Sequence, residues 1–191
     1  MKRAKILLVL LLFLIVFIIS VVISAKYFSA KYSEKKQLKI ANNIISNGNK
    51  NETEIITNNE LEENENVIGI LEIPKIDLIA PIQEGTDLDT LKVAIGHFSE
   101  SSFWTGNVAL ASHNRSKYVQ YFERINELQS GDEIIYKTKF GTRKYIVYDS
   151  KIIESTDWSV IENTENNIIT LITCIMNDSS SRLCVKAKEL K

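Results

Sequence analysis

The strongest constraint on this chain is a run of twenty residues near the N-terminus, 6–25, that carries no charge and consists mainly of Leu, Ile, Val and Phe. An α-helix rises about 1.5 Å per residue, so this run matches the roughly 30 Å hydrocarbon core of a bilayer. A helix also satisfies its own backbone hydrogen bonds, which a segment in lipid must do. We therefore predict that residues 1–25 form a cytoplasmic tip and a transmembrane anchor.

A cleaved signal peptide is the competing interpretation of the same segment. Lys2, Arg3 and Lys5 form a basic start, and small residues follow the apolar run. The run is longer than the usual 7 to 15 apolar residues of a signal peptide, and Ile23 or Phe28 would occupy a cleavage position that prefers a small side chain. An uncleaved anchor is therefore favoured. The basic start predicts a single pass with the C-terminal domain on the extracellular face of the cell membrane, although lysines beyond the run weaken the charge asymmetry.

Charge and cysteine content exclude several classes of function. Lys and Arg number 23 and Asp and Glu number 24, so the net charge of -1 predicts no nucleic-acid partner. The two cysteines, Cys174 and Cys184, are too few for a disulfide framework and lack the spacing of zinc ligands. We predict no metal site and no required cofactor, and we leave a calcium requirement open. The acidic residues considered as ligands are scattered along the chain: Glu123, Asp132, Asp157 and Glu162.

Two regions follow the apolar run. Residues 26–66 are polar, and the part from 42 onwards is rich in Asn and Glu, so it buries too little apolar surface to fold alone and is predicted to be a stalk or linker. Residues 67–191 contain short runs rich in Ile, Val, Leu and Tyr, separated by turns. The predicted strands are 67–73, 76–82, 107–112, 133–138, 144–153, 168–174 and 183–188.

Apolar spacing of three and four residues predicts short amphipathic helices at 87–93 and 118–127. Seven or eight strands in about 125 residues favour a closed barrel. The expected fold is therefore all-β, a closed seven- to eight-stranded barrel with a few short helices, preceded by the transmembrane helix.

Cys174 ends an apolar run and precedes a polar stretch, 177–181. Reactive side chains are often presented where a rigid strand opens into a loop. Arg182 begins the next strand, and alternation places it on one face with Cys184 while Leu183 faces the other side. By composition alone, however, Cys174 is a small buried residue more often than a nucleophile.

The chain has two histidines, and His113 ends another apolar run, 106–113. If both runs end at one rim of the barrel, an imidazole and a thiol meet there, and a neighbouring cation favours the reactive thiolate. His97 is predicted to lie in a loop, where it either lines the same cleft or is exposed. Each histidine taken alone is more often structural than catalytic.

Taken together, these residues resemble the sortase signature. The run Thr170-Leu171-Ile172-Thr173-Cys174 is followed eight residues later by Arg182, and Ser112-His113 lies upstream. Further landmarks occur in the family's order: Ile73-Pro74-Lys75-Ile76, Pro81-Ile82-Gln83-Glu84-Gly85, Gly96-His97, Gly131-Asp132 and Arg182-Leu183-Cys184-Val185. The resemblance covers residues 67–191 and is greatest to class D. Two positions depart from the family's usual pattern, Ser112 in place of Gly and Thr105 in place of Pro.

The resemblance implies a cysteine transpeptidase. In that family's chemistry Cys174 is the nucleophile, His113 the general acid and base, and Arg182 the group that stabilises the oxyanion or orients the substrate. Substrate contacts are assigned to three further residues: Thr173, Ser112 and His97. The implied partners are secreted proteins that carry a Leu-Pro-X-Thr-Gly-like sorting signal, an amine of a peptidoglycan precursor, and the membrane.

Two rival interpretations stay open at this point. One is a noncatalytic, membrane-tethered β-barrel that binds a partner and carries a structural disulfide between Cys174 and Cys184. The other is a cysteine hydrolase that cleaves peptides without joining them to an amine. The state of the two thiols distinguishes the first from the transpeptidase, and an amine acceptor distinguishes the second.

Overall fold

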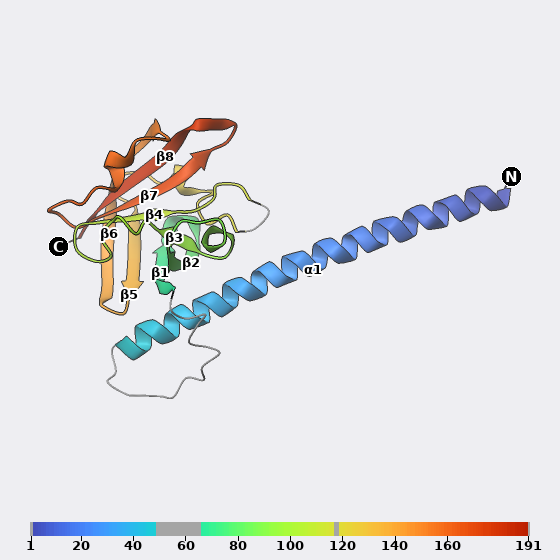
Figure 1. Ribbon diagram of the computed structural model, residues 1–191, viewed down its shortest axis with the longest axis horizontal. Coiled ribbons are helices and arrows are strands. Elements are labelled where there is room, and N and C mark those ends of the chain that lie inside the picture. Colours follow the sequence, from blue (N-terminus) through green and yellow to red (C-terminus); the bar gives the residue numbers. More distant parts are fainter. Residues whose placement is uncertain (1, 49–65, 117–118, 191) are drawn as a thin grey trace. The chain divides into compact units, whose positions relative to one another are not determined.

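The computed structural model describes residues 2–48, 66–116 and 119–190, and the chain divides into two units, Met1–Ser33 and Glu34–Lys191 (Figure 1). Helix α1 spans Lys2–Gly48. Within it, Leu10–Ser29 has a mean hydropathy of 2.6 and exposes its side chains, so by length and composition it is a candidate membrane span. This segment overlaps the predicted run at 6–25.

The predicted stalk, 26–66, is only partly described by the structure. Residues 26–48 continue helix α1, and residues 49–65 lie outside the described residues. In the second unit, Ala41 in the last turns of α1 packs with Val67 and Ile70 of the first strand. The end of α1 thus contributes apolar surface to the folded unit, which the polar composition of 42–66 did not predict.

The described residues of the second unit form eight strands that close into a barrel in the order β1-β2-β3-β4-β7-β8-β6-β5 (Figure 1). The strands are β1 Val67–Ile73, β2 Leu78–Glu84, β3 Ile95–His97, β4 Asn107–Ala111, β5 Glu133–Thr138, β6 Gly141–Glu154, β7 Ile168–Ile175 and β8 Asp178–Glu189. The pairs β2–β3 and β4–β7 are parallel, and the other pairs are antiparallel. The predicted all-β closed barrel is confirmed.

Alternating side chains fill the barrel interior. Leu71, Leu110, Tyr136, Leu171 and Val185 come from five different strands and belong to one buried apolar cluster. Successive side chains of a strand point to opposite faces. The residues directly before and after each of these buried residues in the chain therefore face outward. This alternation decides which side chains the rim can present to solvent.

Several predicted boundaries differ from the structure. Short 3₁₀ turns, Thr90–Lys92 and Ile125–Glu127, occupy part of the predicted helices at 87–93 and 118–127, of which residue 118 lies outside the described residues. Segments of this length commonly form 3₁₀ turns rather than α-helices. Strand β3 was not predicted, since three residues are too few to show an alternating pattern. Strand β2 begins after another 3₁₀ turn, Pro74–Ile76, where Asp77 adopts a left-handed conformation with φ 54°.

Barrel closure depends on the pairing of β1 with β5. Gly69 lies opposite Thr138 in this pair, and a Cβ at Gly69 would lie 2.3 Å from the backbone oxygen of Lys137. The backbone of β5 cannot move away without disturbing the ladder that closes the barrel. Glycine is therefore required here by the close approach of two backbones.

We predict that Gly69→Ala lowers the free energy of unfolding by about 1 to 3 kcal/mol, the usual cost of forcing an extra group into a packed site. Thermal unfolding of the full chain in detergent, followed by circular dichroism, measures the change. An unfolding temperature equal to that of the unsubstituted chain would contradict the assigned closure.

Candidate active site at the barrel rim

The predicted catalytic residues lie in or just beyond three adjacent strands: Cys174 in β7, Arg182 in β8, and His113 two residues after the end of β4. Strands β4 and β7 are parallel, and their printed register ends with Ala111 opposite Ile172. Strand β8 is antiparallel to β7 and places Arg182 opposite Cys174. Neighbouring strands lie about 4.8 Å apart, so Cys174 and Arg182 are direct neighbours at the rim.

The contact between β4 and β7 continues beyond the last residue of β4. The Ser112 amide donates to the carbonyl of Ile172 at 3.4 Å, and the Thr173 hydroxyl donates to the Ser112 carbonyl at 2.8 Å. The side-chain amide of Asn114 donates to the Cys174 carbonyl at 3.1 Å. These bonds hold the residues on both sides of His113 against β7, and the continued register sets His113 beside Cys174.

Alternation gives the three side chains a common face. Leu171 fills the barrel interior, so Ile172 and Cys174 face outward along β7. Val185 is likewise internal, which directs Cys184 and Arg182 outward along β8. Continued past Ala111, the last residue of β4, the same parity directs His113 outward, so we expect an imidazole, a thiol and a guanidinium to lie in one row across the three strands.

An irregularity in β7–β8 lies next to this row. The register shifts between Cys174 and Ile175, so the three serines at 179–181 have no partner on β7, although Ser181 still pairs with Glu154 of β6. The Arg182 guanidinium donates to the carbonyls of Ser179 at 3.0 Å and Ser181 at 2.8 Å. Bulges often occur beside active sites, where they redirect a side chain. Here the bulge holds the arginine close to the exposed thiol.

The two cysteines have different environments. Both are free thiols, Cys174 exposed and Cys184 1% exposed. Burial raises the pKa of the Cys184 thiol to about 11. Cys184 pairs with Ile172, two positions from the partner of Cys174, and such diagonal cross-strand neighbours are about 7 to 8 Å apart, too far for a disulfide. The disulfide of the rival interpretation is therefore contradicted.

An apolar cluster adjoins the row on the outer face of the barrel. Its members come from β4, β7, β8 and the turn Trp158–Ile161, which lies between β6 and β7. They are Ala109, Val160, Ile161, Ile172 and Cys184, with Phe98 and Ile153 packed against them. Apolar side chains thus lie next to the thiol on the side toward the middle of β7.

Asn107 holds the connection between β6 and β7 over this cluster. It is fully buried, and its side-chain amide donates to the carbonyls of Val160 and Glu162, both at 2.9 Å. The Thr170 hydroxyl donates to its side-chain oxygen at 2.8 Å. Sequence reasoning missed Asn107; the only signal was a polar residue at the start of an apolar strand.

A groove of about 640 Å³ lies on the other side of Cys174. Polar and charged residues from the connection between β4 and β5 line one part of it, and apolar residues from β6, β7 and β8 line the rest. The lining residues are Asn114, Arg115, Glu123, Arg124, Asn126, Glu127, Ile152, Cys174, Ile175, Met176 and Leu183. Cys174 therefore lies between an apolar surface and a mixed, charged groove.

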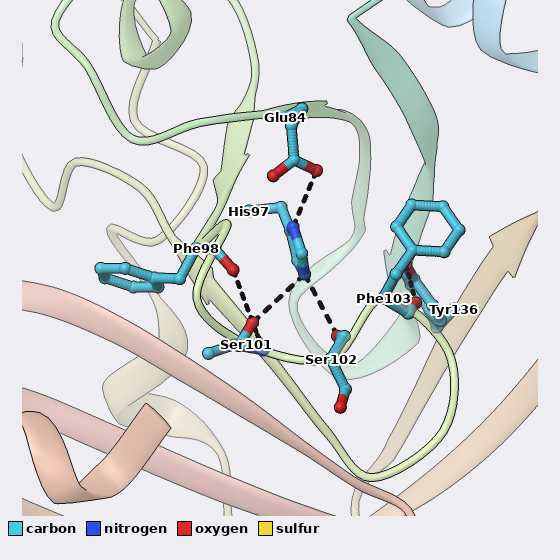
Figure 2. Close-up of polar contacts among 8 residues, drawn as sticks. Glu84, His97, Phe98, Ser101, Ser102, Phe103 and Tyr136 are labelled. Atoms are coloured by element: carbon cyan, nitrogen blue, oxygen red, sulfur yellow. Dashed lines mark hydrogen bonds and ion pairs between the residues drawn. The ribbon is translucent and has the colours of Figure 1, made fainter. Parts of the chain in front are cut away.

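His97 does not belong to this row. It ends β3 and is 2% exposed, where a loop position was predicted. Figure 2 shows its ring between Glu84 and two serines: Nδ1 donates to the Glu84 carboxylate at 2.9 Å, and Nε2 lies 3.2 Å from both the Ser101 hydroxyl and the Ser102 carbonyl. These contacts fix the loop between β3 and β4, and His97 does not line the groove.

Thr173 and Ser112 lie in the barrel wall. Both are buried, the Thr173 hydroxyl bonds the Ser112 carbonyl, and the Ser112 hydroxyl has no hydrogen-bond partner among the described residues. Their bonds position the neighbouring His113 and Cys174, and their assignment as substrate contacts stays a prediction. Among the described residues no group of three His, Cys, Asp or Glu side chains is arranged to hold a metal ion.

A closed β-barrel with an exposed rim cysteine, flanked on neighbouring strands by a histidine and an arginine, defines a recognisable class of protein. The model of the sortase domain family matches residues 71–190. The chain therefore belongs to the sortase family.

Individual relatives agree with this assignment. The chain is 36% identical over 109 residues to sortase D of Bacillus subtilis strain 168 and 32% identical over 125 residues to sortase A of Bacillus anthracis. These matches cover 56% and 65% of this chain but only 53% and 60% of the relatives' lengths. A solved structure described as a Clostridium perfringens sortase D5 transpeptidase has 30% identity and a TM-score of 0.67, covering 84% of this chain and 99% of that one. The predicted resemblance to class D is supported.

We predict that iodoacetamide at pH 8 adds to the folded chain once, at Cys174. Cys184 stays protonated and covered, because burial raises its pKa to about 11, and it reacts only after unfolding in guanidinium. Mass spectrometry of digested protein locates the adducts. Equal labelling of both cysteines in the folded chain would contradict the assigned burial.

The same pKa shift predicts a pH dependence of stability. The Cys184 thiol has a pKa of about 8.5 in the unfolded chain and about 11 in the folded chain. Its contribution to stability is therefore complete at pH values below about 8.5 and is lost as the pH rises toward about 11. Cys184→Ala should show a smaller loss of stability between these pH values than the unsubstituted chain. Denaturant unfolding at several pH values measures the difference.

We predict that Asn107→Ala lowers the free energy of unfolding by about 3 kcal/mol, because a buried carbonyl, a partly buried carbonyl and a buried hydroxyl lose the partner that Asn107 supplies. The unfolding temperature should fall by about 6 to 12 °C, and residues 155–167 should become sensitive to protease. Asn166→Ala in the same connection is the control, since Asn166 is exposed. Equal effects of the two substitutions would contradict the role given to Asn107.

Proposed function

We propose that this protein is a membrane-anchored cysteine transpeptidase that cuts a Leu-Pro-X-Thr-Gly-like sorting signal between Thr and Gly and transfers the Thr carbonyl to an amine. The observation that carries the proposal is the row of His113, Cys174 and Arg182 on one face of three adjacent strands. Each group in the row has a chemical task in acyl transfer, and no other described cysteine is exposed.

In the first half of the reaction, the Cys174 thiolate attacks the Thr carbonyl carbon of the donor peptide. A nearby imidazolium and guanidinium favour the thiolate over the thiol. Arg182 stabilises the oxyanion that develops, or orients the peptide, and His113 protonates the departing glycine amine. The C–N bond breaks, a thioester to Cys174 forms, and His113 is left neutral.

In the second half, neutral His113 removes a proton from the incoming amine, which attacks the thioester carbonyl. The new C–N bond replaces the C–S bond, and Cys174 departs as a thiolate beside the imidazolium. The starting ion pair is thereby restored. The acceptor that we propose is an amine of a cell-wall precursor, and water at the same position would give slow hydrolysis instead.

The two surfaces beside Cys174 support a division of labour. The apolar cluster, on the Phe98, Val160 and Ile161 side, suits the leucine and proline of the donor. Asn107 fixes the connection that carries Val160 and Ile161, so this surface is formed before the peptide binds. Binding to a formed surface avoids the entropy cost of ordering a loop.

The location follows from the anchor. The span Leu10–Ser29 would hold the enzyme in the cell membrane with the barrel on the extracellular face, where secreted proteins and wall precursors meet. We propose no required cofactor, because the transfer uses only side-chain groups of the row.

The test incubates the full chain in detergent with a Leu-Pro-X-Thr-Gly peptide and an amine acceptor, and follows the products by mass spectrometry. We predict a thioester at Cys174 and an acceptor-linked product. Cys174→Ala should abolish both, and His113→Ala and Arg182→Ala should each lower the rate by at least about 100-fold.

Cys184→Ala is the matched control for loss of a thiol, and it should still form the thioester because the thiol of Cys184 takes no part in the chemistry. Turnover in Cys174→Ala would contradict the proposal. Cleavage that yields only the hydrolysed peptide at every acceptor concentration would favour the hydrolase instead.

A further inference from the structure

The groove of about 640 Å³ beside Cys174 has a charge arrangement that the proposed reaction leaves unexplained. Four charged side chains line it: Arg115, Glu123, Arg124 and Glu127. All four come from the connection between β4 and β5, which also contains His113. Their pairing decides which charges can meet a ligand.

Two of the four charges neutralise each other. Arg124 donates to both carboxylate oxygens of Glu127, each bond 2.8 Å long, and its third nitrogen donates to the carbonyl of Ile76 at 3.1 Å. The hydrogen bonds from Arg124 lower the pKa of Glu127, which keeps the pair charged and closed. Such a bidentate pair is a fixed part of the groove wall, and its charges compensate each other rather than pair with a ligand.

The other two charges are exposed and belong to no such pair, although the Glu123 carboxylate is near enough to Arg124 to contribute to the raised pKa of that guanidinium. Among the described residues, the Glu123 carboxylate and the Arg115 guanidinium make no side-chain hydrogen bond or ion pair. Among its described lining residues, the groove therefore presents one carboxylate and one guanidinium outside the Arg124–Glu127 pair, together with the side-chain amides of Asn114 and Asn126. A ligand with one positive and one negative group is complementary to this pair.

We propose that the groove is the acceptor subsite and that it selects an amine whose neighbouring carbon carries a carboxylate, as at the end of an amino acid. Glu123 attracts the ammonium form, and Arg115 pairs with the carboxylate. This inference rests on the proposed function, because it assigns the second substrate of the same reaction. Glu123 and Arg115 act as specificity determinants, and Cys174, at the edge of the groove, carries the acyl group to be transferred.

The position of the groove agrees with the order of the reaction. The donor's apolar residues would lie over the apolar cluster, and the glycine end leaves from the other side of the thiol. The vacated side is the groove, which opens on Cys174 and begins at Asn114, next to His113. An amine that enters here reaches the thioester from the side of the imidazole, which takes its proton as the C–N bond forms and the C–S bond breaks.

The experiment compares two acceptors, glycine and glycinamide, which differ only in the carboxylate. The full chain in detergent is loaded with a Leu-Pro-X-Thr-Gly peptide, and mass spectrometry gives the ratio of amine-linked to hydrolysed product. This ratio compares the acceptor with water in the same enzyme, so a change in donor binding cancels. Free-amine concentrations are matched, because the two amines have different pKa values.

We expect the unsubstituted chain to favour glycine, and Arg115→Met to reduce that preference by about fivefold, the size of one exposed ion pair. Arg115→Glu should reverse the preference, a result that general damage to the site cannot produce. Glu123→Gln should lower the product ratio for both amines. Glu165→Gln and Lys188→Met are charge controls at the opposite end of β7 and β8, and they should leave the preference unchanged.

The outcomes separate the two proposals. A thioester that forms and is resolved by both amines without a preference, or a preference that survives Arg115→Glu, would overturn the acceptor subsite while the transpeptidase stands. If Cys174 forms no thioester with the peptide, the proposed function fails and the subsite fails with it. A glycine preference that reverses in Arg115→Glu supports both.

Discussion

The parallel pairing of β4 with β7 is the constraint on which the site depends. These strands are about sixty residues apart in the chain, and parallel strands end at the same edge of a sheet. His113 and Cys174 each follow or end one of them, so the parallel register brings both to one rim. An antiparallel pairing of the same two strands would have placed them at opposite ends of the barrel, with no shared chemistry.

The second requirement is that side chains alternate between the two faces of each strand without a one-residue shift. A shift of one residue in any of the three strands would turn Cys174, His113 or Arg182 into the barrel interior. The buried side chains Leu171 and Val185 prevent such a shift, because they would have to leave the core. The hydrophobic core thus fixes which side chains form the row, and the bonds of Ser112 and Thr173 extend that register to the rim.

Asymmetry around the thiol then gives the site its two sides. On one side, buried Asn107 holds a connection over an apolar surface with three side-chain hydrogen bonds, two of them buried and one partly buried. On the other side, the connection between β4 and β5 carries charges, of which Arg124 and Glu127 close on each other. An apolar wall and a charged groove thus lie on either side of the Cys174 thiol, an asymmetry that agrees with the two chemically different substrates of the proposed reaction.

The sequence by itself determined the long apolar N-terminal helix, the β class and most strands, because twenty uncharged apolar residues and period-two runs reflect local backbone physics. It also singled out Cys174, His113 and Arg182 through their spacing and their resemblance to sortases. Tertiary structure decided the rest. Strand β3 and the burial of His97 depend on partners distant in the chain, as does the choice between a free thiol and a disulfide. The pairing of Arg124 with Glu127, which leaves Glu123 and Arg115 open, depends on how a loop folds over the rim, and such packing has no periodic signal in the sequence.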